Sequence, residues 1–523
     1  MGVALGVGSV QQRFEDPRVL LGDRLRGVYR LLAEEGERLF PHDYFADLYK
    51  ESVRGRPTVP ARVVATVMVL QSLEGLSDRE ACDRLERDLA WQAAAGVDAG
   101  CVAFHPTVLV GQRNRLRASG RPKRFLEDTK VVARQAGVMG NRVRVLDSTP
   151  IYDAVATQDT VTQLRAAIRK LLRTLDEPVA EQVRGALVRD DEYGTPGKPP
   201  CDWDDPEARE ALIDGLVRDA LAALAVVDGM TLGRAVWEAA ELLALVAGQD
   251  VEEGEDGVFR IARRVAADRV ISTVDTEARH GRKSRDRRFD GYKAHVSTDP
   301  DGEFIDDVVV TPANTHDGDV GVVDDLLADH ADVDEKPTVM GDSAYASPDT
   351  IGHLEDDGFD VVTKVPPATN RPGMFTKDDF GVDVDRERVV CPAGCIVPIR
   401  FSPDGSGRAE FGFRCAGCPQ RERCTTSPSG RTVKVHRRED ILQRKKREQA
   451  TGTWETAYRG TRPKVERKIA HFMRVMCGGR KARTRGRERV QTDAVTRAAA
   501  INLARLATLH VAFTDGRWTA TTP

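Results

Sequence analysis

The 523-residue sequence lacks any hydrophobic run long enough to cross a membrane. Its longest strongly apolar run covers residues 63–70, whereas a transmembrane helix needs roughly 20 such residues. Residues 1–17 contain neither a basic start nor a hydrophobic stretch, so we expect no signal peptide. Both absences predict a cytoplasmic protein without a membrane partner, in which the nine cysteines serve as thiols or metal ligands rather than as disulfides.

The sequence also lacks a net charge that would by itself indicate a polyanionic partner. Its 78 Lys and Arg residues nearly balance 82 Asp and Glu residues, which leaves a net charge of −4. The charges are nevertheless segregated, because residues 431–489 hold 20 basic and six acidic residues, a local charge of +14, and the remaining chain therefore carries −18. A second basic stretch, residues 279–293, holds seven basic and two acidic residues. Such runs are often solvated surfaces, but they also provide the phosphate contacts of DNA-binding proteins.

The first 135 residues carry the signals of helices joined by short turns. One helix is expected to begin after Pro60 and to stop at Gly75, and Ser77 with Glu80 has the spacing of a capping box for the next helix. We therefore predict an α-helical N-terminal domain over residues 1–135, either a plain helical bundle or a DNA-binding unit of the helix-turn-helix kind. In the second case, the candidates for reading a DNA sequence are Arg54, Arg56, Arg62 and Arg79.

From residue 140 the pattern changes to strands that alternate with helices. Three strands in a meander are followed by helix, strand, helix and strand, which is the order of the ribonuclease H fold. We predict an α/β ribonuclease H-like core over residues 140–365, a mixed sheet with flanking helices, interrupted by a helical insertion at 153–265. The expected strands cover residues 142–149, 291–298, 303–311, 338–341 and 359–365, and the expected helices cover residues 320–330 and 349–354.

Three acidic residues stand where this topology brings distant segments together. Asp147 is expected at the tip of the first strand and Asp342 at the end of the fourth, and these two strands are neighbours in the ribonuclease H fold. Glu466 flanks the apolar stripe of a helix that we expect to begin at Pro463. Each acid alone has a plain structural alternative: a turn cap, an Asx turn, or an ion pair with the base four residues earlier. Together, three carboxylates suit a pair of Mg²⁺ or Mn²⁺ ions.

Motifs along nearly the whole chain resemble those of one enzyme family. They are Leu-Asp-Ser-Thr-Pro at 146–150, Asp-Ala-Val-Ala-Thr-Gln-Asp-Thr at 153–160, Ala-Arg-His-Gly-Arg-Lys-Ser at 278–284, Asp-Gly-Tyr-Lys-Ala-His at 290–295, Thr-Pro-Ala-Asn at 311–314, Gly-Asp-Ser-Ala-Tyr at 341–345 and Tyr-Arg-Gly-Thr-Arg-Pro-Lys-Val-Glu-Arg-Lys at 458–468. The chain thereby resembles the DDE transposases of bacterial insertion sequences, in the subgroup with a helical N-terminal domain and a Cys-bearing insertion before the Glu. The resemblance implies that Asp147, Asp342 and Glu466 are the catalytic triad and the ligands of two Mg²⁺ or Mn²⁺ ions. It also implies metal-dependent DNA cleavage and strand transfer, in which a freed 3′-OH attacks target DNA.

The surroundings of Glu466 depart in part from a signature of this family, Tyr-x₂-Arg-x₃-Glu-x₆-Lys. Arg462 keeps its spacing to Glu466 and carries over as a phosphate contact, whereas Tyr458 lies one residue too far away. Position 473, where the Lys would fall, is Met473. Trp454 is either a core residue or a platform on which an unpaired base stacks. The resemblance and the basic runs together predict these DNA-binding residues: Arg462, Lys464, Arg467, Lys468, Arg282, Lys283, Lys293 and Tyr458.

Five of the nine cysteines crowd into 34 residues and include a Cys-x₂-Cys pair. Thiolates at this density suit a structural Zn²⁺ in a loop-rich insertion at 366–430, and reduced thiols without a metal are the alternative. By resemblance, the zinc ligands are Cys391, Cys415, Cys418 and Cys424, and Cys395 is spare or an alternative ligand. The other four are expected to be ordinary buried thiols, namely Cys82, Cys101, Cys201 and Cys477.

The last region, residues 431–523, is expected to be basic and helical, to carry Glu466 and to close the core with a helix at 494–509. Residues 480–489 follow two glycines, which predicts a mobile basic arm. Three histidines in family-like segments are each either structural or part of the site, namely His280, His295 and His316.

The function that these features predict is transposition of an insertion sequence. The expected partner is double-stranded DNA, both the terminal inverted repeats of the element and the target, with a homodimer assembled on DNA and an association with the nucleoid. Two alternatives remain open: a metal-dependent nuclease that cleaves without joining strands, and a zinc-containing DNA-binding regulator.

Overall fold

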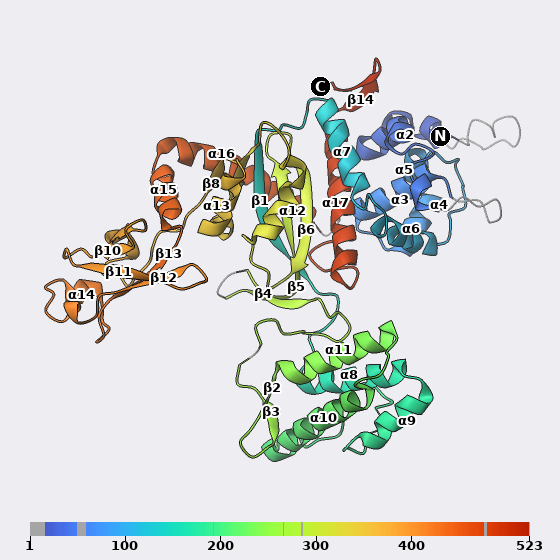
Figure 1. The fold of residues 1–523 in the computed structure, drawn as a ribbon. Helices are drawn as coiled ribbons and strands as arrows, with labels where there is room; N and C mark the ends of the chain where they lie inside the picture. The colour runs from blue at the N-terminus through green and yellow to red at the C-terminus, as the bar shows by residue number, and fades with distance from the viewer. Residues whose placement is uncertain are drawn as a thin grey trace, which may run out of the picture.

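The computed structural model describes residues 16–49, 59–191, 193–264, 266–283, 286–474 and 478–521. At its centre lies a mixed sheet in which β5 pairs with β6 on one side and with β1 on the other, and β7 and β8 follow β1 (Figure 1). The first three of these strands in the chain run antiparallel, whereas β7 is parallel to β1 and β8 to β7. This is the expected ribonuclease H-like order, with the first and fourth strands of the core side by side. The strands are β1 (Val143–Tyr152), β5 (Arg288–Asp299), β6 (Phe304–Pro312), β7 (Thr338–Gly341) and β8 (Val361–Thr363).

A sixth strand, β4 (Arg279–Arg282), belongs to the sheet although its basic sequence predicts no strand. It pairs antiparallel with the first residues of β5, from Arg282 opposite Arg288 to Arg279 opposite Gly291. β5 is 12 residues long and extends beyond β6, so its free end provides the backbone partners that β4 needs.

Helices cover both faces of the sheet. On one face, α17 (Arg487–Thr508) packs on β6 and α16 (Gly452–Phe472) packs on β1, because Val145 and Met340 contact Val465. On the other face, Leu146 and Val339 lie in a cluster with α12 (Val320–Leu327) and α13 (Pro348–Asp356). Side chains on a strand point alternately to the two faces, so neighbouring residues of β1 and β7 contact different helices.

In the described residues, seven α-helices precede the sheet, and several local predictions about them are confirmed. Gly75 ends α3 with a left-handed φ of 66°, and Ser77 and Glu80 form the predicted capping box of α4. α4 and α5 are separate helices, because the Asp88 carboxylate accepts from the Ala90 amide and starts α5. The helices are α1 (Pro17–Leu21), α2 (Gly27–Leu39), α3 (Ala61–Glu74), α4 (Asp78–Arg87), α5 (Leu89–Ala95), α6 (Thr107–Arg117) and α7 (Arg124–Gln135).

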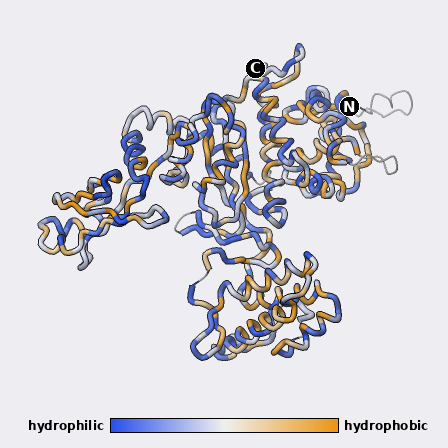
Figure 2. The backbone as a smooth tube through the Cα atoms, viewed as in Figure 1, coloured by the Kyte–Doolittle hydropathy of each residue, from blue (hydrophilic) through white to orange (hydrophobic). Residues whose placement is uncertain are grey.

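These helices share one hydrophobic core with the sheet. A single cluster of buried residues joins Leu32 of α2 and Val67 of α3 to Val308 of β6 and Leu503 of α17. α17 lies between the sheet and the first helices (Figure 1), and hydrophobic residues are concentrated in the central strands and in the helices that pack around them (Figure 2). The first helices are therefore continuous with the core in packing.

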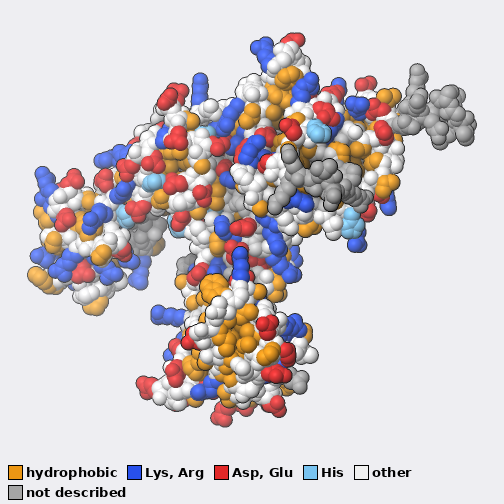
Figure 3. All heavy atoms as spheres, turned by 45° about the vertical axis from the view of Figure 1, so that its right-hand side comes forward, with side chains coloured by type: hydrophobic (Ala, Val, Ile, Leu, Met, Phe, Trp, Pro, Cys, Tyr) orange, Lys and Arg blue, Asp and Glu red, His pale blue; other side chains and the backbone are white. Residues whose placement is uncertain are grey.

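A separate helical unit follows β1 and has its own hydrophobic cluster. It comprises α8 (Thr160–Thr174), α9 (Glu177–Ala186), α10 (Pro206–Val227) and α11 (Arg234–Gln249). The residues after α11 form a hairpin of β2 (Val251–Glu253) and β3 (Phe259–Ile261), where the helical pattern was expected to continue. The helix cannot continue here because the chain turns between the two strands, and Gly257 in that turn adopts a left-handed φ of 73°, which glycine allows. In Figure 3 hydrophobic side chains gather on the surface of this unit. Leu221, Trp237 and Leu245 are exposed side chains of α10 and α11.

The cysteine-rich region has a sheet and a core of its own, which the expectation of a loop-rich insertion missed. Its five antiparallel strands are ordered β13-β12-β11-β10-β9, and they enclose an apolar cluster that includes Val389, Val397 and Phe411. Strands of three to six residues, of which alternate side chains are buried, leave only a weak sequence pattern. The sheet also continues beyond residue 430. Its elements are β9 (Gly381–Asp383), β10 (Arg388–Val390), β11 (Ile396–Phe401), β12 (Ser406–Glu410), α14 (Arg421–Cys424) and β13 (Thr432–His436).

The C-terminal part corrects two expectations. α16 begins at Gly452, capped by Thr451, so Pro463 lies inside the helix rather than in its first turn. Residues 480–486 pack on the core instead of forming a mobile arm: the Arg480 carbonyl accepts from the Tyr152 amide, and Arg483 donates to the Leu76 carbonyl. α17 is the expected closing helix, and α15 (Glu439–Gln449), β14 (Val511–Thr514) and β15 (Arg517–Ala520) complete the chain. In the described part of the chain, no helix combines the length and the apolarity that crossing a bilayer demands.

Candidate active site

The pairing of β1 with β7 brings Asp147 and Asp342 together. Val145 lies opposite Met340 and Leu146 opposite Gly341, so the next residues along the two strands are Asp147 and Asp342. Both acids fall on the face of the sheet that Val145 and Met340 turn toward α16. Asp342 follows the last residue of β7, as expected, and its carboxylate also accepts from the Ala344 amide, which is the Asx turn considered as its structural role.

Asp147 does not lie at the tip of its strand, as the sequence had led us to expect. β1 runs on to Tyr152, and Asp147 stands opposite Val296 of β5 in its middle. It is β7 that ends here, which opens this edge of β1. The open edge also explains why Pro150 is tolerated within the strand. The backbone nitrogens of Pro150 and Tyr152 point to the same edge of β1, and at that edge the Tyr152 amide bonds to residue 480 and not to a sheet strand. Pro150, which has no amide hydrogen, therefore leaves no sheet hydrogen bond unmade.

Glu466 reaches the same place from α16, and Arg462, one turn earlier, stands between the three acids. The Arg462 Nη2 atom lies 2.9 Å from Asp147 Oδ2 and 3.6 Å from Asp342 Oδ2, and its Nε atom lies 3.8 Å from Glu466 Oε1. Three carboxylates from three distant segments thus meet around one guanidinium.

The electrostatics of this cluster are those of a site with excess negative charge. Burial raises the pKa of Asp147 and the Asp342 carboxylate adds to that, while Arg462 only partly offsets them. Burial lowers the pKa of Arg462, but the charges of Asp147 and Asp342 outweigh burial and leave it raised. One positive charge among three carboxylates leaves a net negative charge that favours further cations.

The acidic cluster opens into a cleft of about 450 Å³ with basic walls. Arg282 and Lys283 come from the end of β4, Lys293 from β5, and Arg480 from the segment that packs beside β1. The cleft therefore combines an acidic floor with basic walls. Three of the four wall residues were predicted to bind DNA, and the fourth, Arg480, was not. Arg480 was expected in a mobile arm, and its packing against β1 is what places it here.

A fourth carboxylate in the cleft, Asp317, was missed from the sequence. It lies in the loop after β6, and its Oδ1 atom lies 3.0 Å from Lys293 Nζ, which also donates to the Thr315 carbonyl at 2.7 Å. One sequence signal could have indicated it: Asp317 belongs to a polar run that follows a buried strand and comes three residues after the family-like segment Thr-Pro-Ala-Asn at 311–314.

Tyr458 lies nearer to the cluster than its imperfect spacing suggested. Because α16 is continuous, Tyr458, Arg462 and Glu466 recur every four residues and share one face of the helix. Arg462 and the acids affect the pKa of Tyr458, which burial raises above its ordinary value. Trp454 stacks on Tyr458 with ring centroids 4.7 Å apart and is only half-buried, which does not fit the core residue that was one of its two alternatives.

Three of the predicted DNA-binding residues lie on another side of α16. Lys464, Arg467 and Lys468 are two, five and six residues from Arg462, which turns them away from the cleft. Lys464 pairs with Asp301 at 3.4 Å and Arg467 with Glu303 at 3.0 Å, both beside the β5–β6 turn. The Lys468 side chain is 4% exposed and faces Glu303, so its predicted phosphate contact is incompatible with its burial.

The histidines and the N-terminal arginines have mainly structural surroundings. His295 is buried between Thr311 and Tyr345, His316 accepts from the Gly318 amide, and His280 pairs with Asp290 at 2.6 Å. Arg62 is largely buried, donates to the carbonyls of residues 32 and 33 and pairs with Glu37, which rules it out as a reader of DNA. Arg79 is exposed, whereas Arg54 and Arg56 lie outside the described residues.

The five clustered cysteines line one cavity of about 20 Å³, which is room for a single water-sized body. Burial raises the pKa of Cys424, and the nearby thiols of Cys391, Cys415 and Cys418 add to the shift. A tetrahedral Zn²⁺ holds its sulfurs about 3.8 Å apart. The thiols converge on one cavity but are more widely spaced than that, since no three of them lie mutually within 4.8 Å. Of the other cysteines, Cys82 is buried, Cys101 and Cys201 are half-buried, and Cys477 lies outside the described residues.

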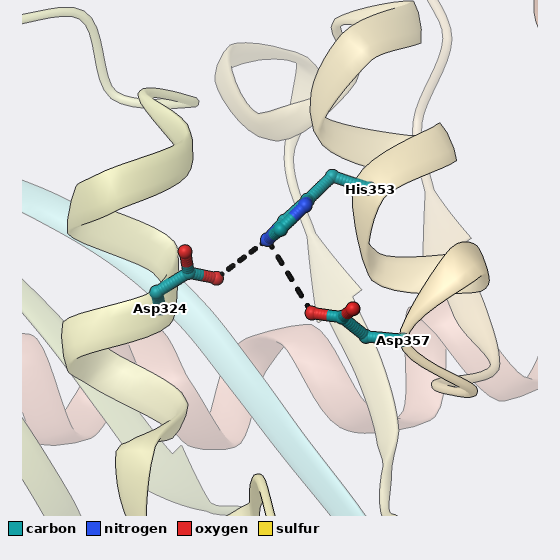
Figure 4. Close-up of side chains that lie close together, drawn as sticks. All are labelled: Asp324, His353 and Asp357. Carbon is teal, nitrogen blue, oxygen red and sulfur yellow. Dashed lines mark hydrogen bonds and ion pairs between the residues drawn. The ribbon is translucent and has the colours of Figure 1, made fainter.

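Within the described residues, one group of three potential metal ligands has all its ligand atoms within 4.8 Å of one another. It consists of Asp324 on α12 and of His353 and Asp357 in and just after α13 (Figure 4). His353 Nε2 lies 2.7 Å from Asp324 and 3.4 Å from Asp357, so the group also forms an ion pair that joins the two helices. None of its members lines the acidic cleft.

The comparisons with known proteins agree with the fold and the cleft. The family model described as "Transposase DDE domain" matches residues 262–503, which include Asp342 and Glu466, and the one described as "Transposase domain (DUF772)" matches residues 16–115. Asp147 lies outside both matches, because it precedes the helical unit in the sequence and the DDE match begins at residue 262, near the end of that unit. No curated protein and no solved structure matches the chain. The two transposase matches and the ribonuclease H-like order of the sheet together place this chain in the family of DDE-type transposases of insertion sequences.

Proposed function

We propose that this chain binds the terminal inverted repeats of its insertion sequence and catalyses metal-dependent DNA cleavage and strand transfer through Asp147, Asp342 and Glu466. The observation that carries the proposal is the meeting of these three carboxylates around Arg462, at the floor of a cleft with basic walls. A phosphodiester backbone would find both cation ligands and counter-charges there.

The residues present fit divalent cations of the Mg²⁺ or Mn²⁺ type. All three acids offer hard oxygen donors, which such ions prefer, and Arg462 neutralises only one of the three charges. Asp342 and Glu466 are 35% and 64% exposed at the side chain, so a cation has access from the solvent. Two ions bound by these carboxylates would activate the attacking water or hydroxyl and stabilise the leaving oxygen.

The basic walls would hold the DNA while the bond is exchanged. Arg282, Lys283 and Arg480 line the cleft and would contact phosphates, and Lys293, held by Asp317, lies beside the acids. Hydrolysis at the element end breaks one P–O bond and frees a 3′-OH. In strand transfer that hydroxyl forms a new P–O bond as a bond of the target is broken, so the joining step needs no nucleotide cofactor.

Recognition of the inverted repeats, assembly of a homodimer on DNA and nucleoid association are part of the same proposal. Two element ends must be held together for transposition, which two copies of the chain would achieve. Arg79 on α4 is exposed and is the predicted recognition arginine that stays available in the described residues. We also propose a structural Zn²⁺ among Cys391, Cys415, Cys418 and Cys424, supported by the shared cavity.

A strand-transfer assay tests this function. The chain is incubated with Mg²⁺ or Mn²⁺, plasmid DNA and a precleaved duplex taken from the DNA that flanks the coding sequence. Joined products support the proposal, nicks without joining support a nuclease, and binding without either supports a regulator. Asp147→Ala and Glu466→Ala should abolish joining. Asp324→Ala, an exposed acid outside the cleft, is the matched control and should leave it intact.

A further inference from the structure

Arg462 and a divalent cation require the same three carboxylates. The guanidinium already contacts Asp147, Asp342 and Glu466, at 2.9, 3.6 and 3.8 Å. An Mg²⁺ ion draws neighbouring oxygen ligands to about 3 Å from one another. Here the oxygens of the three acids do not all lie within 4.8 Å of each other, because the planar guanidinium separates them. Closing the acids around a cation therefore displaces Arg462.

The contact of Arg462 with the acids is incomplete, which makes exchange of partner feasible. Its Nη1 atom is buried and has no hydrogen-bond partner among the described residues. A buried donor without a partner carries a desolvation cost that a phosphate oxygen would remove. The cleft that would hold such a phosphate begins beside Arg462, where Arg480 and Lys293 also line the wall.

The part of α16 that carries Arg462 lacks one helical hydrogen bond, which makes it easier for the Arg462 side chain to move. Pro463 follows it inside α16 and has no amide hydrogen to donate to the carbonyl of Arg459. The turn that carries Arg462 is therefore less firmly bonded than the rest of the helix, while Val465 keeps the helix anchored on Val145 and Met340.

We propose that Arg462 is an exchangeable counter-ion of the acidic cluster: it neutralises the acids until a phosphate of bound DNA takes over its guanidinium and frees them for divalent cations. This inference rests on the proposed function, because it takes Asp147, Asp342 and Glu466 as the cation ligands. DNA binding and cation binding then assist each other by the same factor, as linkage requires. Arg462 acts as a positioning residue that delays cation loading until DNA is in the cleft.

Binding of Mn²⁺, measured by the loss of the free-ion EPR signal, tests the exchange without any catalytic readout. Without DNA, Arg462→Ala should bind Mn²⁺ about tenfold more tightly than the unaltered chain, because the competing charge is gone. Adding a duplex of the flanking DNA should raise the Mn²⁺ affinity of the unaltered chain by about tenfold, and that of Arg462→Ala by less than about twofold. Arg459→Ala, an exposed arginine of the same helix that pairs with Glu455 and does not line the cleft, is the matched control and should keep the DNA-free affinity unchanged.

Unchanged or weaker DNA-free Mn²⁺ binding by Arg462→Ala would overturn the exchange. If that variant does not fold by circular dichroism, Arg462→Lys serves instead, since one ammonium cannot span three carboxylates and should give an intermediate affinity. Asp147→Asn separates the two proposals. If it leaves Mn²⁺ binding intact, the proposed ligands are wrong; if it weakens binding while Arg462→Ala has no effect, the ligands stand and only the exchange fails.

Discussion

Two lysines near α16 have the same chemistry but different surroundings. Lys283 is exposed in the basic cleft, whereas Lys468 is 4% exposed and burial lowers its pKa to about 8. Phosphate contacts release condensed counterions, so each contact contributes to the salt dependence of DNA binding. Residue type and a basic run therefore do not by themselves decide which lysine can contact DNA.

We predict that Lys283→Ala weakens DNA binding and lowers the slope of log affinity against log salt by about 0.9. Lys468→Met should leave both quantities unchanged, because Lys468 is buried against Glu303, which keeps its pair with Arg467. Fluorescence anisotropy of a labelled duplex at several salt concentrations measures the effect. An equal loss of slope in both variants would show that the burial of Lys468 does not govern its role.

A buried charge network gives a second prediction at the residue scale. Asp306 on β6 is 1% exposed and lies 3.0 Å from Arg144 of β1 and 2.7 Å from His330. Burial alone would raise the pKa of Asp306, but the hydrogen bond of His330 and the charges of Arg144 and Lys130 outweigh it and hold the pKa well below its ordinary value. The network joins β6 to β1 through Arg144 and to α7 through Lys130.

Asp306→Asn should lower the stability by about 3–5 kcal/mol at neutral pH, since it leaves Arg144 buried without its counter-charge. A carboxyl with a lowered folded-state pKa stabilises the fold above its unfolded pKa of about 3.9 and loses this contribution as pH falls. The stabilities of the variant and the unaltered chain should therefore converge in acid. Thermal unfolding across a pH series measures both, and a constant difference down to the lowest pH would contradict the assignment.

At the scale of elements, the cysteine-rich sheet presents a proposed metal site. Four of the five clustered cysteines are the proposed ligands, and Cys395 is the spare residue. A structural Zn²⁺ contributes directly to the folding free energy of the element that it crosslinks.

We predict that the purified chain holds one zinc per molecule, as elemental analysis by mass spectrometry would measure. Cys418→Ser should remove most of the zinc and lower the unfolding temperature, whereas Cys395→Ser should keep the zinc. If Cys395→Ser loses the zinc and Cys418→Ser keeps it, then Cys395 is a zinc ligand and Cys418 is the spare residue. No zinc in the unaltered chain would contradict the site.

At the scale of the whole molecule, hydrophobic packing does not follow the order of the chain. The first helices, which end at Gln135, share a core with β6, which begins at Phe304, and with α17, which begins at Arg487, while the helical unit at 153–265 has a core of its own. Segments that share a core unfold together, and a unit with its own core can fold alone.

We predict that a fragment of residues 153–265 unfolds cooperatively on heating, as circular dichroism would show. A fragment of residues 136–523, which lacks the first helices, should lose the cooperative transition of the core because buried residues such as Leu503 and Val308 become exposed. A cooperative core transition in the second fragment would show that the first helices form an independent domain.

Much of this architecture could be predicted because its signals are local. Gly75 and the Ser77–Glu80 capping box set helix ends by backbone conformation and short hydrogen bonds, and the strand order followed from alternating hydrophobic residues. The weaker predictions concerned partners that are distant in the chain. β4 depends on the free end of β5, and Asp317 and Arg480 reach the cleft only through packing.

The sequence by itself determined the family resemblance, the candidate acids and the segregation of charge, because these depend on residue types and spacings along the chain. Only the tertiary structure decided which charges act together. It placed Arg462 between the three acids, turned Lys464 and Arg467 toward the β5–β6 turn, and buried Lys468. The reason is physical: helix periodicity, strand register and burial determine which charges face one another, and Coulomb interactions depend on those distances and on the surrounding dielectric.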